Sequence, residues 1–217
     1  MRWLALSFFL GSLGPLALAA QLRDDQAAGT DEQVAAGQAA FAMCAGCHGP
    51  TGDGVIGVGP RLNSANYLAA APNSFFEDTL KKGRAGTNMV AFGASMPQEQ
   101  VDGLVAYIRS WQTTDSIELD ESPLAGTSEE GEQVWNDICS RCHGRSGAGY
   151  SEAGSGTGIG RADFLDVASD GFLRAVIKEG KDNTQMKSFS TDSPISVADL
   201  TDDQIDSVIK YLRANAW

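Results

Sequence analysis

The sequence predicts an all-α protein built from two similar halves, and three observations lead to this prediction. The motif Cys-x-x-Cys-His occurs at residues 44–48 and again at residues 139–143. The segments behind the two motifs align without a gap over residues 67–92 and 164–189. Apolar residues recur at helical spacing, whereas the alternating runs typical of strands are missing. We therefore expect two small helical domains of the same fold.

The repeat keeps a constant register behind the motifs. An offset of 97 pairs Tyr67 with Phe164, Phe75 with Phe172, and Met89 with Met186. The last helix of each half repeats at an offset of 104, which pairs Tyr107 with Tyr211 and Arg109 with Arg213. Since structural roles follow such a register, a residue assigned in one half predicts its counterpart in the other.

Helix signals place the elements in the same order in both halves. Thr30 and Gln33 have the spacing of a capping box ahead of the first motif, and the stretch from Ser128 to Ile138 repeats this pattern. Pro97 is suited to the first turn of the last helix of the first half, and Thr201 with Gln204 opens its counterpart. The apolar positions of these last helices follow the i, i+3, i+4, i+7 pattern of a core-facing stripe: Val101, Leu104, Val105 and Ile108, then Ile205, Val208, Ile209 and Leu212.

The remaining segments are loops and a linker. Gly and Pro are concentrated in residues 49–60 and 144–160, and the acidic stretch 113–126 has no periodicity. We therefore divide the chain into a signal segment at 1–20, a first domain at 30–112, a linker at 113–126 and a second domain at 127–217. Domains of this size have small cores, which a bound apolar group would complete.

The first twenty residues have the three-part form of a secretory signal. Arg2 precedes an apolar run, and the tripeptide at residues 17–19 is Ala-Leu-Ala. We expect cleavage near Ala19 or Ala20 and export to the periplasm. The alternative is an uncleaved membrane anchor, because residues 3–20 are just long enough to span a bilayer.

The charge balance narrows the range of partners. The chain of 217 residues has a net charge of −12, which becomes −13 once residues 1–20 and their single Arg are removed. Such a surface repels nucleic acid and anionic lipid and favours redox partners with basic docking patches. The solubility of an exported acidic protein explains the charge equally well.

The cysteines indicate covalent haem rather than disulfides. An exported chain with four Cys normally predicts two disulfides, but here all four Cys and both His belong to the two motifs. Cys44 with Cys47, and Cys139 with Cys142, have the spacing that forms two thioethers to one haem, and the adjacent His then faces the iron. A thioredoxin-like site would need a preceding strand, and a zinc site would need a fourth ligand in each half. We therefore predict two haem c groups with His48 and His143 as iron ligands.

The sixth ligand of each iron is expected to be a methionine, since no His is left. Met186 is the only Met after His143, so it is the candidate in the second half. The first half offers Met89 and Met96, and the repeat favours Met89 because Met89 aligns with Met186.

On these motifs, each half resembles a class I, mitochondrial-type cytochrome c domain, and the tandem resembles the bacterial di-haem c-four type. The resemblance implies that a Gly of the first helix packs against an aromatic residue of the last helix. The matching residues are Gly37 and Phe41 with Tyr107, and Gly131 and Trp135 with Tyr211.

The resemblance also implies a Pro carbonyl that accepts the ring N–H of the proximal His, and Pro60 matches this position for His48. In the second half Gly160 and Arg161 stand where this Pro is expected, which leaves the partner of His143 open. Arg61 and Arg161 are suited to pairing with haem propionates, and a solvated surface role suits each of them as well.

The expected function is that of a periplasmic electron carrier, not an enzyme, between a respiratory or dehydrogenase donor and a terminal acceptor. The alternatives are a membrane-anchored subunit of a larger redox complex and a haem enzyme acting at one site. Catalysis at the iron would require a Met ligand to dissociate, because the sequence offers no further Cys or His.

Overall fold

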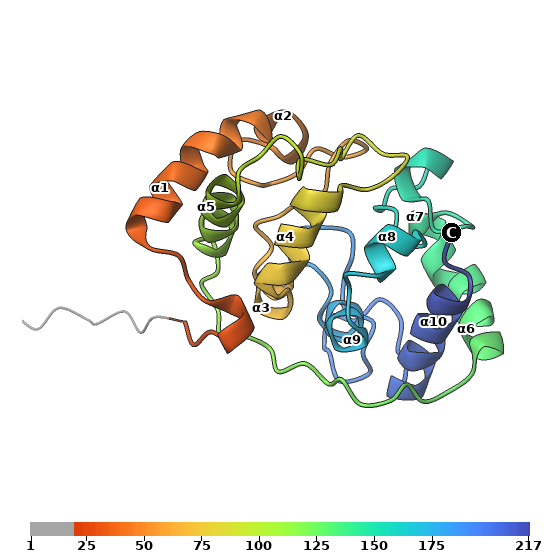
Figure 1. Cartoon of the computed structure of the whole chain (residues 1–217). Coiled ribbons are helices and arrows are strands. Elements are labelled where there is room, and N and C mark those ends of the chain that lie inside the picture. Colours follow the sequence, from red (N-terminus) through yellow and green to blue (C-terminus); the bar gives the residue numbers. More distant parts are fainter. Residues whose placement is uncertain (1–19) are drawn as a thin grey trace, which may run out of the picture.

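The computed structural model describes residues 20–217, so the predicted signal segment lies outside the described residues except for Ala20. The described part is helical, and its only β-type pairings are two isolated bridges, Val55 with Gly59 and Ser190 with Leu200. Figure 1 shows the two halves side by side, with the first from orange to green and the second from green to blue. The all-α prediction is confirmed for these residues.

From Ala20 onward, the first half contains five α-helices and two 3₁₀ turns. They are η1 (Asp24–Gln26), α1 (Asp31–Ala40), η2 (Phe41–Met43), α2 (Ala45–His48), α3 (Ala65–Ala70), α4 (Asn73–Lys82) and α5 (Gln98–Arg109). As predicted, Thr30 and Gln33 form a capping box at the start of α1. Pro97 is the N-cap of α5, one residue before the first turn in which the sequence placed it.

The second half repeats this order. Its elements are α6 (Ser128–Val134), the π-helical turn η3 (Trp135–Cys139), α7 (Ser140–His143), η4 (Gly149–Glu152), α8 (Ala162–Leu165), α9 (Asp170–Glu179) and α10 (Asp202–Ala214). Thr201 and Gln204 form the predicted capping box of α10. The expected helix from Ser128 to Ile138 differs in detail, because Thr127 caps it and the α-helix gives way to the π-helical turn after Val134.

The π-helical turn accommodates one additional residue. Two residues separate Phe41 from Cys44, whereas three separate the equivalent Trp135 from Cys139. A π-type turn inserts one residue into a helix without breaking the hydrogen-bond pattern on either side. The inserted residue lets the Cys-x-x-Cys-His motif follow the first helix in both halves, although the segment between the core aromatic residue and the first Cys is one residue longer in the second half.

Each half is held together by a close crossing of its first and last helices. A Cβ added to Gly37 in α1 would lie 1.8 Å from the carbonyl oxygen of Gly103 in α5. A Cβ added to Gly131 in α6 would lie 1.9 Å from the carbonyl oxygen of Ser207 in α10. Only glycine permits such an approach of the two backbones. The implied Gly contacts are therefore present, and they involve the backbone as well as the aromatic side chain.

The aromatic contacts implied by the resemblance are also present. The rings of Phe41 and Tyr107 lie 5.5 Å apart, and those of Trp135 and Tyr211 lie 6.0 Å apart. The core residues of both halves include the apolar stripes of α5 and α10, whose predicted members are all buried. The final helices are thus core elements, as their periodicity indicated.

The two halves face each other across an approximate two-fold axis. Phe75 and its counterpart Phe172 pack against each other with ring centroids 4.9 Å apart. Tyr67 packs against Phe172 at 5.5 Å, and its counterpart Phe164 packs against Phe75 at 6.0 Å. Residues related by the offset of 97 therefore make reciprocal contacts, which is the pattern of a two-fold interface.

Hydrogen bonds across this interface are reciprocal too. The backbone N–H of Asn66 donates to Asp182 Oδ1 at 3.0 Å, and the N–H of Ala85 donates to Asp163 Oδ2 at 2.6 Å. The offset of 97 exchanges the members of these two pairs. The hydroxyl of Ser64 also donates to Asp182 Oδ1, at 2.7 Å. Contacts of this kind hold the halves in a fixed relation.

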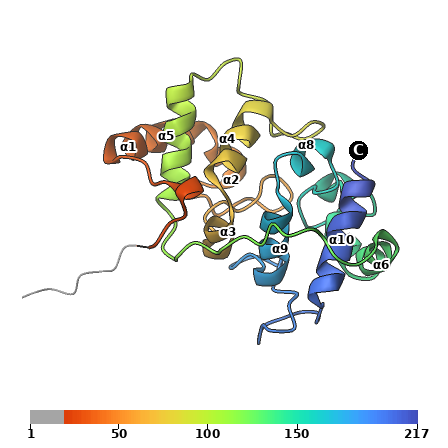
Figure 2. The ribbon, with the colours of Figure 1, turned by 60° about the horizontal axis from the view of Figure 1, so that its bottom comes forward.

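The segment 113–126 lies against both halves, and Figure 2 shows it running from α5 past α9 to α6. Ile117 N–H donates to Ala69 O at 2.9 Å in the first half. Arg174 of α9 donates to the carbonyls of Asp120 and Ser122 at 2.6 and 2.9 Å. The linker is therefore hydrogen-bonded along its course, while the exact domain boundaries stay a prediction.

None of the helices within residues 20–217 has the length and apolar character needed to cross a bilayer.

Candidate haem sites

The two Cys pairs lie on short helices at the surface of each half. Cys44 precedes α2 and Cys47 lies within it, and Cys139 and Cys142 have the same placement at α7. All four thiols are free. Burial raises the pKa of Cys139 to about 12, and burial with the nearby Cys47 raises that of Cys44. None of the four thiols is thus paired in a disulfide, and Cys44 and Cys139 are not set up as thiolates, which fits attachment sites for a covalent group.

Each proximal histidine is oriented by a backbone carbonyl. His48 Nδ1 lies 2.9 Å from the carbonyl oxygen of Pro60, as the resemblance implied. His143 Nδ1 lies 2.8 Å from the carbonyl oxygen of Thr157. The contact with the carbonyl fixes Nδ1 as the donor, so Nε2 of each ring is the nitrogen left for iron.

The placement of Gly160 and Arg161 opposite the expected Pro is therefore wrong. Thr157 follows Pro60 by 97 residues, so the register of residues 67–92 extends upstream to the His contact. The carbonyl is supplied by the backbone, and any residue can provide it at this place. Continuing the register upstream from Tyr67 would have identified Thr157 in the sequence.

The surroundings of both histidines favour a neutral ring. Burial lowers the pKa of His48 and of His143, outweighing the carbonyl contact that acts in the opposite direction. The charge of Lys181 lowers the pKa of both rings further. Neutral imidazole is the form that binds iron.

The candidate distal methionines lie in matching turns. The amide of Arg84 donates to the carbonyl of Met89 at 2.7 Å, and the amide of Lys181 donates to that of Met186 at 2.6 Å. The amides of Met89 and Met186 donate to Thr hydroxyls two residues before them, at 3.1 and 3.0 Å. Met96 instead belongs to the buried core of the first half and is 7% exposed.

Several charged side chains near the sites were not singled out from the sequence. Lys181 of the second half reaches into the first, where its Nζ donates to the carbonyl of Arg61 at 3.1 Å and lies 3.7 Å from the centre of the Tyr67 ring. Burial lowers the pKa of Lys181 to about 8. The carboxylates of Asp163 and Asp182 bridge the halves as described above. Only the folded chain brings these residues together, so no local pattern marks them.

The guanidinium of Arg61 has a hydrogen-bond donor that no protein atom satisfies, which indicates a binding place for an anionic group. One arm of its guanidinium, Nη2, lies 3.0 Å from Asp53. Its Nε is buried and has no hydrogen-bond partner. An unsatisfied buried donor next to the His48 loop fits a haem propionate.

A metal bound by side chains alone does not fit the two sites. Within residues 20–217, no group of three or more His, Cys, Asp or Glu side chains is arranged to hold an ion. A haem needs only the Cys pair, the His and one distal ligand, which each half offers.

A tandem of helical halves, each with its own Cys pair and carbonyl-anchored His, is the architecture of the di-haem c-type cytochromes, which transfer electrons. The chain belongs to the family described as cytochrome c oxidase, cbb3-type, subunit III, whose family model matches residues 32–108 and again residues 126–212. The predicted tandem of class I cytochrome c domains with two covalent haem c groups is thereby confirmed.

Similar proteins include two cbb3-type cytochrome c oxidase subunits named FixP. The chain is 32% identical to FixP of Azorhizobium caulinodans over 129 residues, which cover 56% of this chain and 42% of that protein. It is 30% identical to FixP of Sinorhizobium medicae over 132 residues, which cover 56% of this chain and 43% of that protein. The matched part of the chain corresponds to less than half the length of either relative.

Among solved structures, the reducing HAO-like protein complex Kustc0457/Kustc0458 of Kuenenia stuttgartiensis contains a chain of similar fold. The match has a TM-score of 0.53 and 19% identity, and it covers 88% of this chain and 98% of that chain. At this identity the likeness concerns the fold alone.

Proposed function

We propose that this di-haem cytochrome carries electrons on the periplasmic side of the membrane, from a respiratory or dehydrogenase donor to a terminal acceptor. The proposed iron ligands are His48 with Met89 and His143 with Met186. The observation that carries the proposal is the matching geometry of the two Met turns, since Met186 is the only candidate in its half. Bound haem iron would supply the redox chemistry by cycling between the ferric and ferrous states.

The residues of the chain would set the conditions for this cycling. The soft thioether of Met favours ferrous iron and raises the reduction potential. The carbonyls of Pro60 and Thr157 hold the imidazole rings in orientation, which limits rearrangement when the oxidation state changes. A closed coordination shell would also keep substrates away from the iron.

The ligand assignment can be tested by absorption spectroscopy of the oxidised protein. Coordination of iron by Met gives a weak far-red band, and we expect Met89→Ala and Met186→Ala each to remove about half of it, because each would release one of two irons. Met96→Ala is the matched control, because this side chain lies in the same half but in the core. Loss of the band in Met96→Ala with its retention in Met89→Ala would refute the assignment.

A carrier function further predicts closed iron sites. All Cys and His of the sequence belong to the two motifs, so no side chain of these types is free for catalysis. We expect the reduced protein to bind no carbon monoxide at neutral pH. Rapid binding at one of the two haems would instead indicate an open site and support a haem enzyme.

A membrane-anchored subunit of a larger redox complex is the second candidate, and it is favoured by the similarity to FixP subunits. Cell fractionation with N-terminal sequencing separates the two. Recovery from the periplasm with a start near Gln21 would support the free carrier. Recovery from membranes with residues 1–20 retained would support the anchored subunit.

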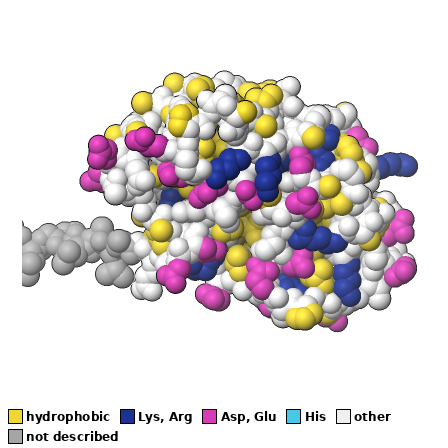
Figure 3. Space-filling view, in the orientation of Figure 1, with side chains coloured by type: hydrophobic (Ala, Val, Ile, Leu, Met, Phe, Trp, Pro, Cys, Tyr) yellow, Lys and Arg dark blue, Asp and Glu magenta, His cyan; other side chains and the backbone are white. Residues whose placement is uncertain are grey.

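For the partner, we propose a protein with a basic docking surface, on account of the net charge of −12. Figure 3 shows acidic side chains spread over both halves with basic ones among them, so the attraction would be of long range. Electron exchange with a redox protein of high positive net charge should then slow markedly as ionic strength rises. A rate independent of salt would contradict this part of the proposal.

A further inference from the structure

The guanidinium of Arg161 is buried at the junction of the two halves, with a residue exposure of 8%. Its Nη1 donates to the carbonyl of Ala85 in the first half at 2.6 Å. Its flat face lies 4.2 Å from the centre of the Trp217 ring. Its Nε is buried and has no hydrogen-bond partner. Two faces of the group are thus held in place while one donor remains unsatisfied.

Arg161 also lacks a counter-charge. Within residues 20–217, no carboxylate oxygen lies within 4.0 Å of its guanidinium nitrogens, although Asp163 binds the neighbouring Ala85 amide. The comparably buried Arg174 is paired with Asp206 at 2.6 Å. A buried charge is costly unless it is paired, so the surroundings of Arg161 favour an anion.

The position of this unsatisfied donor matches that of Arg61 in the other half. Arg61 directly follows Pro60, the carbonyl partner of His48, and its Nε is also buried without a partner. The residue at the equivalent place in the second half is Gly158, which directly follows Thr157. A Cβ added to Gly158 would lie 3.5 Å from Arg161 Nε.

The guanidinium of Arg161 therefore occupies the space beside Gly158, where a side chain equivalent to Arg61 would begin. Each half thus has an unsatisfied guanidinium Nε beside the residue that follows the His-binding carbonyl. In the first half this residue is Arg61 itself, whereas in the second half the guanidinium comes from Arg161, three residues after Gly158. A Cβ at Gly158 would be in ordinary contact with Arg161 Nε, so the guanidinium adjoins this loop position directly.

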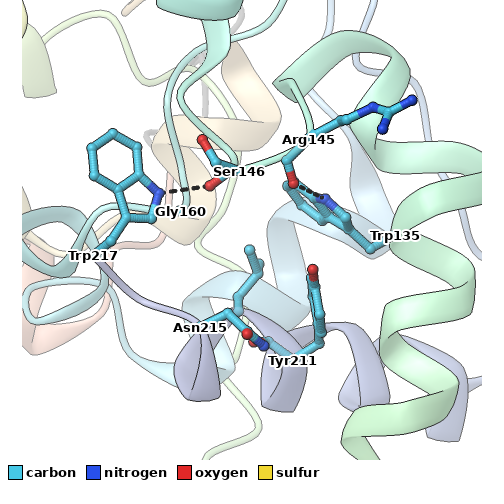
Figure 4. A pocket seen from close by; sticks show the side chains of 8 residues that line it. Trp135, Arg145, Ser146, Gly160, Tyr211, Asn215 and Trp217 are labelled. Carbon is cyan, nitrogen blue, oxygen red and sulfur yellow. Dashed lines mark hydrogen bonds between the residues drawn. The ribbon is translucent and has the colours of Figure 1, made fainter.

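We propose that Arg161 is the carboxylate-binding residue of the second haem site, where it holds a haem propionate as Arg61 does in the first, and that Trp217 positions it. This inference rests on the proposed haem placement. Figure 4 shows Trp217 with its indole N–H directed at Ser146, and this hydrogen bond to the Ser146 carbonyl is 2.7 Å long. The backbone of Trp217 is tied to Gly160 and Ala162, at 3.2 and 2.9 Å. The indole is therefore fixed on both sides, and it keeps the guanidinium in one plane.

The test compares Arg161→Gln with Arg145→Gln. Arg145 precedes η4, whereas Arg161 follows it; Arg145 is exposed, and Figure 4 shows its guanidinium directed away from Trp217. A cation near a haem disfavours the ferric state, so its removal lowers the reduction potential. In a spectroelectrochemical titration, Arg161→Gln should lower the midpoint potential of one haem transition and leave the other unchanged. Arg145→Gln should leave both unchanged.

Two further measurements separate carboxylate binding from a purely structural role. Resonance Raman spectra should show a changed propionate bending band in Arg161→Gln, and Arg61→Gln should lower the potential of the other transition. Trp217→Leu should act on the same transition as Arg161→Gln, in the same direction and by less. Arg161→Lys should restore part of the potential because it restores the charge.

Unchanged potentials and propionate bands in Arg161→Gln would overturn the proposal and leave Arg161 as a tie between the halves. If Arg161→Gln does not fold, Arg161→Lys and Trp217→Leu decide by the same measurements, and unchanged potentials and bands in both overturn the proposal. Measurements on the wild-type protein test the proposed function separately from the proposed role of Arg161. Two haem transitions together with the far-red Met band support the proposed function whatever the Arg161 variants show.

Discussion

The first and last helices of the second half, α6 and α10, cross closely at Gly131, and this crossing gives a sharp prediction for Gly131→Ala. The added Cβ would lie 1.9 Å from the Ser207 carbonyl oxygen, about 1.5 Å short of the 3.4 Å of ordinary contact. It would also lie 2.9 Å from Tyr211 Cβ. Because the obstacle is backbone, the helices themselves must separate.

The cost can be estimated from the contacts that this separation disturbs. Overpacking a core costs about 1–3 kcal/mol. Ser207 also links the helices by accepting from Thr127 N–H and donating to Glu130, and a net hydrogen bond contributes about 1 kcal/mol. The better helix propensity of Ala returns about 1 kcal/mol. We therefore expect a net destabilisation of about 3 kcal/mol, which corresponds to a fall in Tm of about 6–12 °C for a chain of this size that unfolds as one unit.

Thermal and guanidinium unfolding followed by far-UV circular dichroism measure this difference. Glu132→Ala is the control, because Glu132 is the exposed neighbour of Gly131 in α6. This control should change the free energy of unfolding by no more than about 0.5 kcal/mol, as surface substitutions normally do. If Gly131→Ala unfolds within about 0.5 kcal/mol of Glu132→Ala, then the tight helix crossing is not what holds this half together.

Two further predictions concern buried carboxylates. Asp206→Asn should cost about 3–5 kcal/mol in guanidinium unfolding at pH 7, because it leaves Arg174 buried without its partner. Burial acts to raise the pKa of Asp206, but the bonds from Arg174 and the Ala125 amide outweigh it and lower the pKa. The stabilisation by this pair should therefore be complete above about pH 4 and lost as the pH falls through the lowered pKa, and an equally steep acid dependence in Asp206→Asn would contradict this. Asp182→Ala should cost about 1–3 kcal/mol, because it leaves the fully buried Ser64 hydroxyl and the Asn66 amide without their acceptor. It should also separate the unfolding of the two halves in calorimetry, and a single unchanged transition would show that the reciprocal contacts do not couple them.

The sequence alone determined the repeat, the haem attachment motifs and the helical class. These are local properties, because a thioether site needs five consecutive residues and a helix needs a periodic stripe with a cap. Gly37 and Gly131 could be matched to the last helices by resemblance, since a close helix crossing tolerates no side chain. The candidates Met89 and Met186 followed from the register and from elimination, and their matching turns support the same choice.

The tertiary structure decided what depends on contacts between distant segments. A backbone carbonyl carries no residue signature, so a search for a second Pro missed the partner of His143, although the repeat register leads to Thr157 and the structure shows it beside the ring. The π-helical turn at Trp135–Cys139 absorbs a residue that the sequence shows only as a change of offset. Lys181 and Arg161 belong to the second half but donate hydrogen bonds to carbonyls of the first half. They can do so because the packing of Phe75 on Phe172 brings the loops of both halves together. Local pattern therefore fixes each haem-binding half, whereas the packing of one half on the other determines which charged side chains lie at the two candidate haem sites.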